Sequence, residues 1–338
     1  MTTRRLSRRR TAGLLLAGVA VPSVGVFRRS RAQALDKVIY QTGWRAQAQQ
    51  GGLYQAIATG LYRQHGLEVE IRHAGPQLDI NTLLLAGRVD FIESNLFSAL
   101  NYARENLPGI GIAAIFQKDE RVLLSHPGVG NDSLPALKGK PILISTAGRQ
   151  SFWQWLKAKY GYTDEQARPY TFSLAPFLAD KNMSMQGFVT TEPLALRAAG
   201  VDPVIQLLAD HGFNNYQSLI VCQPKLVQEK AEVVQRFIDA SLKGWASYLG
   251  GDAAPGNALI KRDNADMTDE TLAYAIATMR QYKLAEGGDA ARLGLGAMTA
   301  ERWWSFYKEM VAVGALPDGL AVDKYFTLQF VNKRVGML

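Results

Sequence analysis

Short apolar segments alternate with amphipathic segments along the chain from residue 35 onward. In "LEVEI" (residues 67–71), apolar and acidic side chains alternate, which is typical of a half-buried β-strand. In residues 53–61, large apolar side chains recur at every fourth position and form one stripe of a helix. The repeated alternation of strands and helices predicts an α/β fold, in which mainly parallel sheets are flanked by helices.

This alternation occurs in two cycles, which predicts two α/β units. The first cycle runs from "KVIY" to "GIGIAAIF", and the second runs from "LKGKPILIS" to "PVIQLL". After Pro224 the chain is nearly all helical, with segments such as "VVQRFIDASLKGWASYL". We therefore expect two lobes, with lobe 1 formed by residues 35–117 and 218–338 and lobe 2 by residues 118–217. The chain then crosses between the lobes in "QKDERVLLSHP" and "YQSLIVCQP".

The formal net charge of +8 comes from the first 34 residues. Eight arginines and no acidic residue precede Leu35, and the 30 basic residues that remain balance 30 acidic ones, so we expect no nucleic-acid partner. Within this segment the arginines are followed by "AGLLLAGVAVPSVGVF" and by the small-x-small run "AQA". We therefore expect an export signal over residues 1–34, cleaved after about Ala34. "SRRRT" also resembles a twin-arginine motif.

The local motifs of common enzymes and metal sites are missing from the sequence. The four histidines show no H-x-x-x-H or H-E-x-x-H spacing, and Cys222 is the single cysteine, which excludes a cysteine-based metal cluster and an internal disulfide. No phosphate-binding G-x-x-x-x-G-K-[ST] run and no hydrolase G-x-S-x-G run occurs. We therefore expect no catalytic residue, no metal and no cofactor.

Several longer segments resemble one known family. The export signal, "GLYQAIATGLYRQHGLEVEI", "LLLAGRVDF", "GFVTTEPLALRAAGVDP" and "VVQRFIDASLKGW" together resemble ABC transporter solute-binding proteins, in the branch that includes binders of thiamine pyrimidine precursors, sulfonates and nitrate. The resemblance covers residues 36–335. It implies a type II periplasmic binding fold, a small-molecule solute held between two lobes, and delivery to an ABC permease and its ATPase. It further implies a monomeric, periplasmic protein that is not an enzyme.

The first ligand loop of such proteins often carries a W-x-P-N-x-x-H-x-G-L-Y-like run. Here Trp44 and the final "GLY" (residues 52–54) match, whereas Gln47 replaces the asparagine and Gln50 the histidine. The resemblance therefore implies that the rings of Trp44 and Tyr54 contact a flat solute. The side-chain amides of Gln47 and Gln50 both donate and accept hydrogen bonds, which suits the edge of a heteroaromatic ring.

Three further places match ligand-lining segments of the family, each after a predicted strand. The residues concerned are Asn95 and Phe97, then Arg149, Ser151 and Trp153, and finally Glu192. A carboxylate at Glu192 is placed to accept a hydrogen bond from a ligand amino group. Each has a structural alternative: Phe97 and Trp153 as core residues, Glu192 as an acid in the first turn of a helix, and Arg149 in a salt bridge.

The predicted solute is a small flat heteroaromatic molecule, similar to a thiamine or pyrimidine precursor. The alternative is an organic anion such as a sulfonate, nitrate or an aromatic carboxylate, for which Arg45 and Arg149 supply charge. A remote alternative is an enzyme similar to the pyrimidine-precursor synthases that share this fold. The single cysteine, the glutamine at the histidine position and the export signal all disfavour it.

Overall fold

The computed structural model describes residues 34–75 and 78–337. The predicted export signal lies outside these residues, except for Ala34. Residues Leu35–Leu338 form one compact unit. Within the described part of the chain, no helix is both long and apolar enough to cross a membrane.

The first sheet has the strand order β2-β1-β3-β10-β4. Its strands are β1 (Asp36–Gln41), β2 (Leu67–Arg72), β3 (Phe91–Asn95), β4 (Ile110–Phe116) and β10 (Gln217–Cys222). Strand β10 runs antiparallel to both of its neighbours, and the other four strands share one direction. We call the elements around this sheet lobe 1.

The second sheet has the strand order β7-β6-β8-β5-β9, and the elements around it are called lobe 2. Its strands are β5 (Arg121–Ser125), β6 (Ile142–Ile144), β7 (Ala167–Pro169), β8 (Ser184–Phe188) and β9 (Val204–Leu207). Strand β5 alone runs against the other four. The reversed strands β5 and β10 are the two segments predicted as crossings, and each enters its sheet directly after the chain leaves the other one. The mainly parallel α/β fold is confirmed, whereas the exact lobe boundaries stay a prediction.

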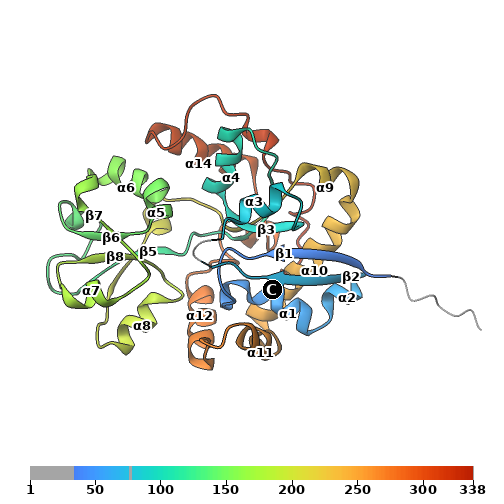
Figure 1. Cartoon of the computed structure of the whole chain (residues 1–338), viewed down its shortest axis with the longest axis horizontal. Coiled ribbons are helices and arrows are strands. Elements are labelled where there is room, and N and C mark those ends of the chain that lie inside the picture. Colours follow the sequence, from blue (N-terminus) through green and yellow to red (C-terminus); the bar gives the residue numbers. More distant parts are fainter. Residues whose placement is uncertain (1–33, 76–77, 338) are drawn as a thin grey trace, which may run out of the picture. The chain divides into compact units, whose positions relative to one another are not determined.

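Helices flank both sheets (Figure 1). Those of lobe 1 that precede the first crossing are α1 (Gly51–Ala58), α2 (Leu61–Gln64), α3 (Ile80–Leu85) and α4 (Leu96–Glu105). Lobe 2 contains α5 (Thr146–Gln150), α6 (Phe152–Tyr160), α7 (Ala175–Ala179) and α8 (Glu192–Ala198). The C-terminal helices are α9 (Pro224–Glu229), α10 (Ala231–Gly250), α11 (Ala254–Asp263), α12 (Asp269–Gln281), α13 (Ala290–Leu293) and α14 (Ala300–Ala312). Short 3-10 turns include η1 (Ala48–Gln50), which leads directly into α1.

Helix α1 approaches α10 very closely, and its two N-terminal glycines make this possible. A Cβ atom built on Gly51 would lie 2.1 Å from Cε1 of Tyr248, and one built on Gly52 would lie 2.2 Å from Cγ of Trp245. Both distances are far shorter than van der Waals contact, so any side chain would force the helices apart. Because Gly51 has ordinary helical angles (φ −55°, ψ −39°), close packing accounts for the glycine pair and a turn does not.

Candidate ligand site

The loop between β1 and α1 is fastened to a carboxylate on the neighbouring strand β3. The backbone N–H of Gly43 and the side-chain Nε2 of Gln50 each donate a hydrogen bond to Oε2 of Glu93, both at 3.0 Å. At the other end of the same amide, Oε1 of Gln50 accepts a hydrogen bond from the backbone N–H of Gln47 at 3.1 Å. Both polar atoms of the Gln50 side chain are therefore engaged, one with strand β3 and one within the loop.

Glu93 also receives a hydrogen bond from lobe 1's reversed strand. The hydroxyl of Ser218 donates to Oε1 of Glu93 at 2.9 Å. Burial raises the pKa of the Glu93 carboxyl, and the hydrogen bonds from Gly43, Ser218 and Gln50 act in the opposite direction. Glu93 thus holds together the loop, β3 and β10 at one end of the first sheet.

Trp44 pairs with an aromatic ring of lobe 2. Its backbone carbonyl accepts a hydrogen bond from the N–H of Ala74 at 3.3 Å, which holds the residue beside the end of β2. Its ring lies 5.2 Å from the ring of Phe172 between centroids, with 39° between the ring planes. The ring of Phe172 also lies 5.2 Å from the ring of Tyr170 between centroids, with 50° between the ring planes. Three rings therefore form one row from the lobe 1 loop to the segment that follows β7.

A second link between the lobes is polar. The Nε2 atom of Gln49 donates hydrogen bonds to the hydroxyl oxygens of Thr190 (2.8 Å) and Thr191 (3.3 Å), which lie between β8 and α8. Gln49 is buried. The sequence analysis did not select this residue because the family motif leaves its position unspecified, although Gln49 lies in the same glutamine-rich run.

Lobe 2 places two carboxyl groups beside these threonines. The Thr190 hydroxyl donates to Oε2 of Glu120, which directly precedes β5, and Oε2 of Glu192 accepts from the Phe188 N–H at 2.7 Å. Burial is the main reason why the pKa of Glu120 is raised to about 8. The charges of Asp119, Glu93 and Glu192 raise this pKa further, and the hydrogen bond from Thr190 lowers it.

Burial also raises the pKa of Glu192, and the Glu192 charge in turn contributes to the raised pKa of the Tyr170 hydroxyl, after burial. The charges of Glu93 and Glu192 both contribute to the raised pKa of Glu120, so the three carboxyl groups lie in one region beside the interlobe contacts. This region is therefore rich in hydrogen-bond acceptors.

The arginines near these residues have other partners. Arg45 forms an exposed salt bridge with Asp266 at 3.2 Å. Arg149, predicted as a ligand residue, donates from Nη2 to the backbone carbonyl of Ala167 in β7 at 2.8 Å. Arg121 pairs with the buried Asp119 at 2.8 Å. Arg45 and Arg149, the two arginines proposed for an anion, therefore each have a partner within the protein, which is a carboxylate for Arg45 and a backbone carbonyl for Arg149.

Tyr54 lies in a different group of side chains from Trp44. Its hydroxyl donates to Oδ2 of Asp263 at 3.2 Å and lies 3.0 Å from Nε2 of His73, and the Tyr54 and His73 rings are stacked, with centroids 6.1 Å apart. Burial, followed by the charge of Asp263, raises the pKa of the tyrosine well above its usual value. The structure pairs the rings of Trp44 and Tyr54 with two different partners and does not bring them face to face.

The two predicted ligand residues after β3 lie at the start of helix α4. The side-chain Oδ1 of Asn95 accepts a hydrogen bond from the N–H of Ser98 at 3.0 Å and caps the helix. The ring of Phe97 is buried in the core, and its backbone N–H donates to Oδ1 of Asn215 at 3.1 Å.

Ser151 and Trp153 lie where the structure departs from the predicted single helix "RQSFWQWLKAKYG". The chain breaks at Ser151 (φ −119°, ψ −103°), which separates α5 from α6, and the Ser151 hydroxyl donates to the carbonyl of Ala147 at 2.9 Å. The Trp153 ring is fully buried, and its Nε1 donates to Asp164 at 2.9 Å. We leave Phe97, Ser151 and Trp153 out of the site proposed below because the fold accounts for their side chains.

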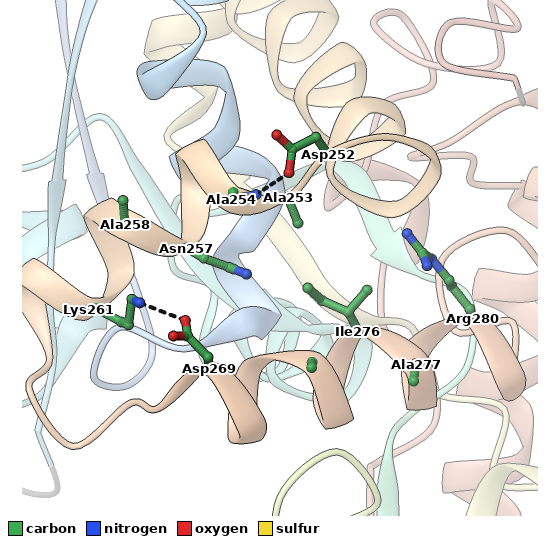
Figure 2. Close-up of a pocket in the computed structure, with 11 residues that line it drawn as sticks. Asp252, Ala253, Ala254, Asn257, Ala258, Lys261, Asp269, Ile276, Ala277 and Arg280 are labelled. Carbon is green, nitrogen blue, oxygen red and sulfur yellow. Dashed lines mark hydrogen bonds and ion pairs between the residues drawn. The ribbon is translucent and has the colours of Figure 1, made fainter.

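Two surface hollows lie away from the interlobe contacts of Trp44 and Gln49. One, of about 620 Å³, lies between α11 and α12; there the carboxylate of Asp252 accepts from the Ala254 N–H and Lys261 pairs with Asp269 (Figure 2). A second, of about 430 Å³, includes Tyr54 and is lined by β1, β2, α1 and α11. Neither hollow is lined by Trp44, Gln49 or Glu120 in this structure. Among the described residues, no group of three His, Cys, Asp or Glu side chains is placed to hold a metal ion.

Comparison with known proteins identifies the family. The family model described as "NMT1/THI5 like" matches residues 47–251, which include the glutamines of the first loop, Glu120 and Glu192. The chain belongs to the NMT1/THI5-like family. This NMT1/THI5-like chain is also 26% identical over 286 residues to the riboflavin-binding protein RibY of Chloroflexus aurantiacus, in an alignment that covers 82% of this chain and 81% of the relative.

Solved structures of low sequence identity share the fold of this NMT1/THI5-like protein. The periplasmic aliphatic sulphonate-binding protein SsuA of Escherichia coli matches with a TM-score of 0.66 and 10% identity, over 86% of this chain and 91% of that one. The alkanesulfonate-binding SsuA of Xanthomonas axonopodis pv. citri, bound to MOPS, matches with a TM-score of 0.63 and 12% identity, over 87% and 98%. The desulfurization enzyme DSZB also matches, with a TM-score of 0.56 and 13% identity, over 88% and 98%.

Proposed function

We propose that this NMT1/THI5-like protein is an exported solute-binding receptor of an ABC importer, which binds a small flat heteroaromatic molecule between its two lobes. The observation that carries this proposal is the row of aromatic rings from Trp44 to Phe172 and Tyr170, beside the three carboxyl groups of Glu93, Glu120 and Glu192. Aromatic faces bind flat rings by offset stacking, and carboxyl oxygens accept hydrogen bonds from ring N–H or amino groups.

The electrostatic character of the site favours a solute that donates hydrogen bonds. Burial raises the pKa of Glu120 and of Glu192, so negative charge is poorly stabilised beside these side chains and an anionic solute meets the same desolvation penalty. Aminopyrimidines and the imide edge of a flavin both present N–H donors on a flat ring. The likeness to a riboflavin-binding protein agrees with this class of solute.

The organic-anion alternative has less support from the arrangement of charges. The fold neighbours include sulfonate-binding proteins, but Arg45 and Arg149 are engaged with Asp266 and the Ala167 carbonyl. An anion site normally supplies guanidinium or backbone donors aimed at the oxyanion. We therefore place the heteroaromatic solute first.

An enzyme function is also less well supported. Cys222 is buried in strand β10, and burial raises the pKa of its thiol far above neutral, which removes it as a nucleophile. The relation to the 4-amino-5-hydroxymethyl-2-methylpyrimidine phosphate synthase of Aspergillus parasiticus covers only 32% of this chain, at 27% identity. We propose that the protein has no catalytic residues, acts as a monomer in the periplasm after cleavage near Ala34, and delivers its solute to a permease and its ATPase.

A thermal-shift screen of the mature chain tests the solute class. Riboflavin, thiamine and aminopyrimidines form one set of probes, and alkanesulfonates, nitrate and aromatic carboxylates form the other. A solute present at 100 times its Kd stabilises the folded state by about 2.7 kcal/mol, which raises the unfolding midpoint by several degrees. We expect shifts from the first set only. A shift from one anion class alone, abolished by Arg149→Ala, contradicts the heteroaromatic proposal and supports the anion alternative.

A further inference from the structure

Phe172 combines three features that packing alone does not explain. It lies between β7 and α7, its side chain is 51% exposed, and its backbone has φ +64°. Residues with a bulky side chain rarely adopt this left-handed conformation, and they keep it mainly where function requires it. A large apolar ring held exposed on a strained backbone is therefore a candidate for a binding role.

The ring of Phe172 contacts one aromatic ring from each lobe. It packs against the rings of Tyr170 and Trp44, at 5.2 Å between centroids in both cases. Tyr170 is 7% exposed, and its backbone N–H donates to the Ile144 carbonyl at 3.2 Å, so it is a fixed support within lobe 2. Trp44 is likewise fixed in lobe 1 through its bond with Ala74.

The spacing of the pair decides how a solute ring can enter. Two stacked carbon rings are separated by about 3.5 Å, so a third ring inserted between Trp44 and Phe172 needs about 7 Å between their faces. Their centroids are only 5.2 Å apart and their planes are tilted by 39°. A flat solute can therefore reach the Trp44 face only if Phe172 moves away from it.

We propose that Phe172 is the lobe 2 half of an aromatic clamp, which covers Trp44 before binding and stacks on the outer face of the solute ring afterwards. This inference rests on the proposed function and adds a specificity-determining residue to the same site. Because the clamp closes only over a flat ring, Phe172 favours planar solutes and slows their dissociation. A saturated or branched solute gains nothing from the second ring.

The test compares variants of the mature chain by calorimetric titration and stopped-flow dissociation, with riboflavin and an aminopyrimidine as probes. Phe172→Ala is expected to weaken binding of the recognised probe by about 3- to 10-fold, mainly through faster dissociation. Phe172→Trp should bind within about twofold of the parent, because it keeps an aromatic face. Leu178→Ala removes another exposed apolar side chain of lobe 2 and serves as the matched control.

The outcomes separate the clamp from the function on which it rests. Equal affinity and dissociation rate in Phe172→Ala and the parent, with binding lost in Trp44→Ala, overturns the clamp and leaves the receptor proposal intact. A parent protein that binds neither probe overturns the proposed solute class and the clamp with it. If Phe172→Leu restores the parent behaviour as fully as Phe172→Trp, the ring serves only as apolar cover and the clamp is wrong.

Discussion

Gln49 of lobe 1 donates hydrogen bonds to Thr190 and Thr191 of lobe 2, so its side-chain amide contributes to the contact between the two lobes. The hydroxyl of Thr190 in turn donates a hydrogen bond to the buried carboxyl of Glu120, which lies beside the first crossing. The resulting chain, from amide to hydroxyl to carboxyl, forms only when the lobes are close together. Hinge closure over a ligand is the usual motion of two-lobed binding proteins, and we propose that these hydrogen bonds stabilise the closed arrangement of the lobes.

Gln49→Ala is expected to weaken solute binding by about 5- to 10-fold, because the closed state loses hydrogen bonds that together contribute about 1 kcal/mol or slightly more. Calorimetric titration measures the affinity, and the radius of gyration from solution scattering measures the closure. Thr191→Val is the graded control, since its bond is longer (3.3 Å) and should matter less. An unchanged radius of gyration and affinity in Gln49→Ala contradicts the role in closure.

Trp44→Ala should reduce affinity for a heteroaromatic solute by about 10- to 100-fold, because it removes the lobe 1 stacking face and its apolar area. Its ring is only partly buried, so the free energy of unfolding should change by about 1 kcal/mol or less. Titration with riboflavin or an aminopyrimidine measures the first effect, and urea unfolding measures the second. Trp304→Ala, on α14, controls for loss of a partly buried tryptophan. Retained affinity in Trp44→Ala argues against the first loop as the ligand loop.

The raised pKa of Glu120 predicts a stability that falls with increasing pH. The carboxyl has an ordinary pKa of 4.5 in the unfolded chain and about 8 in the folded protein, so the folded state binds more protons between these values. The stabilisation is therefore fully present below about pH 4.5 and is lost as the pH rises to about 8. Each pKa unit corresponds to about 1.4 kcal/mol, so the loss amounts to several kcal/mol.

Glu120→Gln should remove most of this dependence, because the amide cannot ionise and still accepts the Thr190 hydrogen bond. Unfolding midpoints measured from pH 5 to pH 8 give the slope for the variant and the parent. Glu301→Gln, which removes an exposed carboxylate at the start of α14, controls for the change in net charge. Parallel slopes in the parent and in Glu120→Gln show that Glu120 is not the titrating group.

Arg149→Ala distinguishes the two solute classes. Its Nη2 donates to the Ala167 carbonyl, so its removal should destabilise lobe 2 by about 1 kcal/mol and leave heteroaromatic affinity within about twofold. Titrations at low and high salt with a ring solute and with an alkanesulfonate provide the measurement. A tenfold, salt-sensitive loss of alkanesulfonate binding in this variant would favour the anion alternative.

Gly52→Ala should destabilise the fold by about 2–4 kcal/mol, because its new methyl group would lie 2.2 Å from the Trp245 ring. Urea unfolding measures the effect. Gly75→Ala is the matched control, since a Cβ atom there meets no heavy atom within 4 Å and φ is not positive. A small effect of Gly52→Ala indicates that α1 and α10 can separate at little cost.

Much of the fold follows from the sequence, because strands and helices leave a local periodic signature. The strands predicted at "KVIY" and residues 67–71 are β1 and β2, and even the segments predicted as crossings form β5 and β10. The break at Ser151 was not predicted, since no proline or glycine interrupts the apolar pattern at that point. The periodic pattern of apolar residues predicts which positions are buried, but it does not predict a distortion of the backbone at a single residue.

The site was less predictable because its contacts join residues far apart in the chain. Glu93, Gln49 and Phe172 gain their proposed roles only from partners that the folded chain brings beside them. The resemblance to a family directed attention to Trp44 and Gln50, yet Gln50 uses both ends of its amide to hold the loop. A polar side chain is available to a solute only if other parts of the folded protein do not already occupy its hydrogen-bonding atoms. Residue type alone does not show which side chains are occupied in this way.

The glycine pair at the start of α1 has a consequence for the thermodynamics of recognition. Because Gly51 and Gly52 seat α1 against the aromatic side chains of α10, the preceding loop is ordered by a helix about 200 residues further along the chain. The conformational entropy of that loop is lost when the protein folds, and the arriving solute does not have to order it. Substitutions in α10, far from any solute contact, should therefore change binding mainly through its entropy.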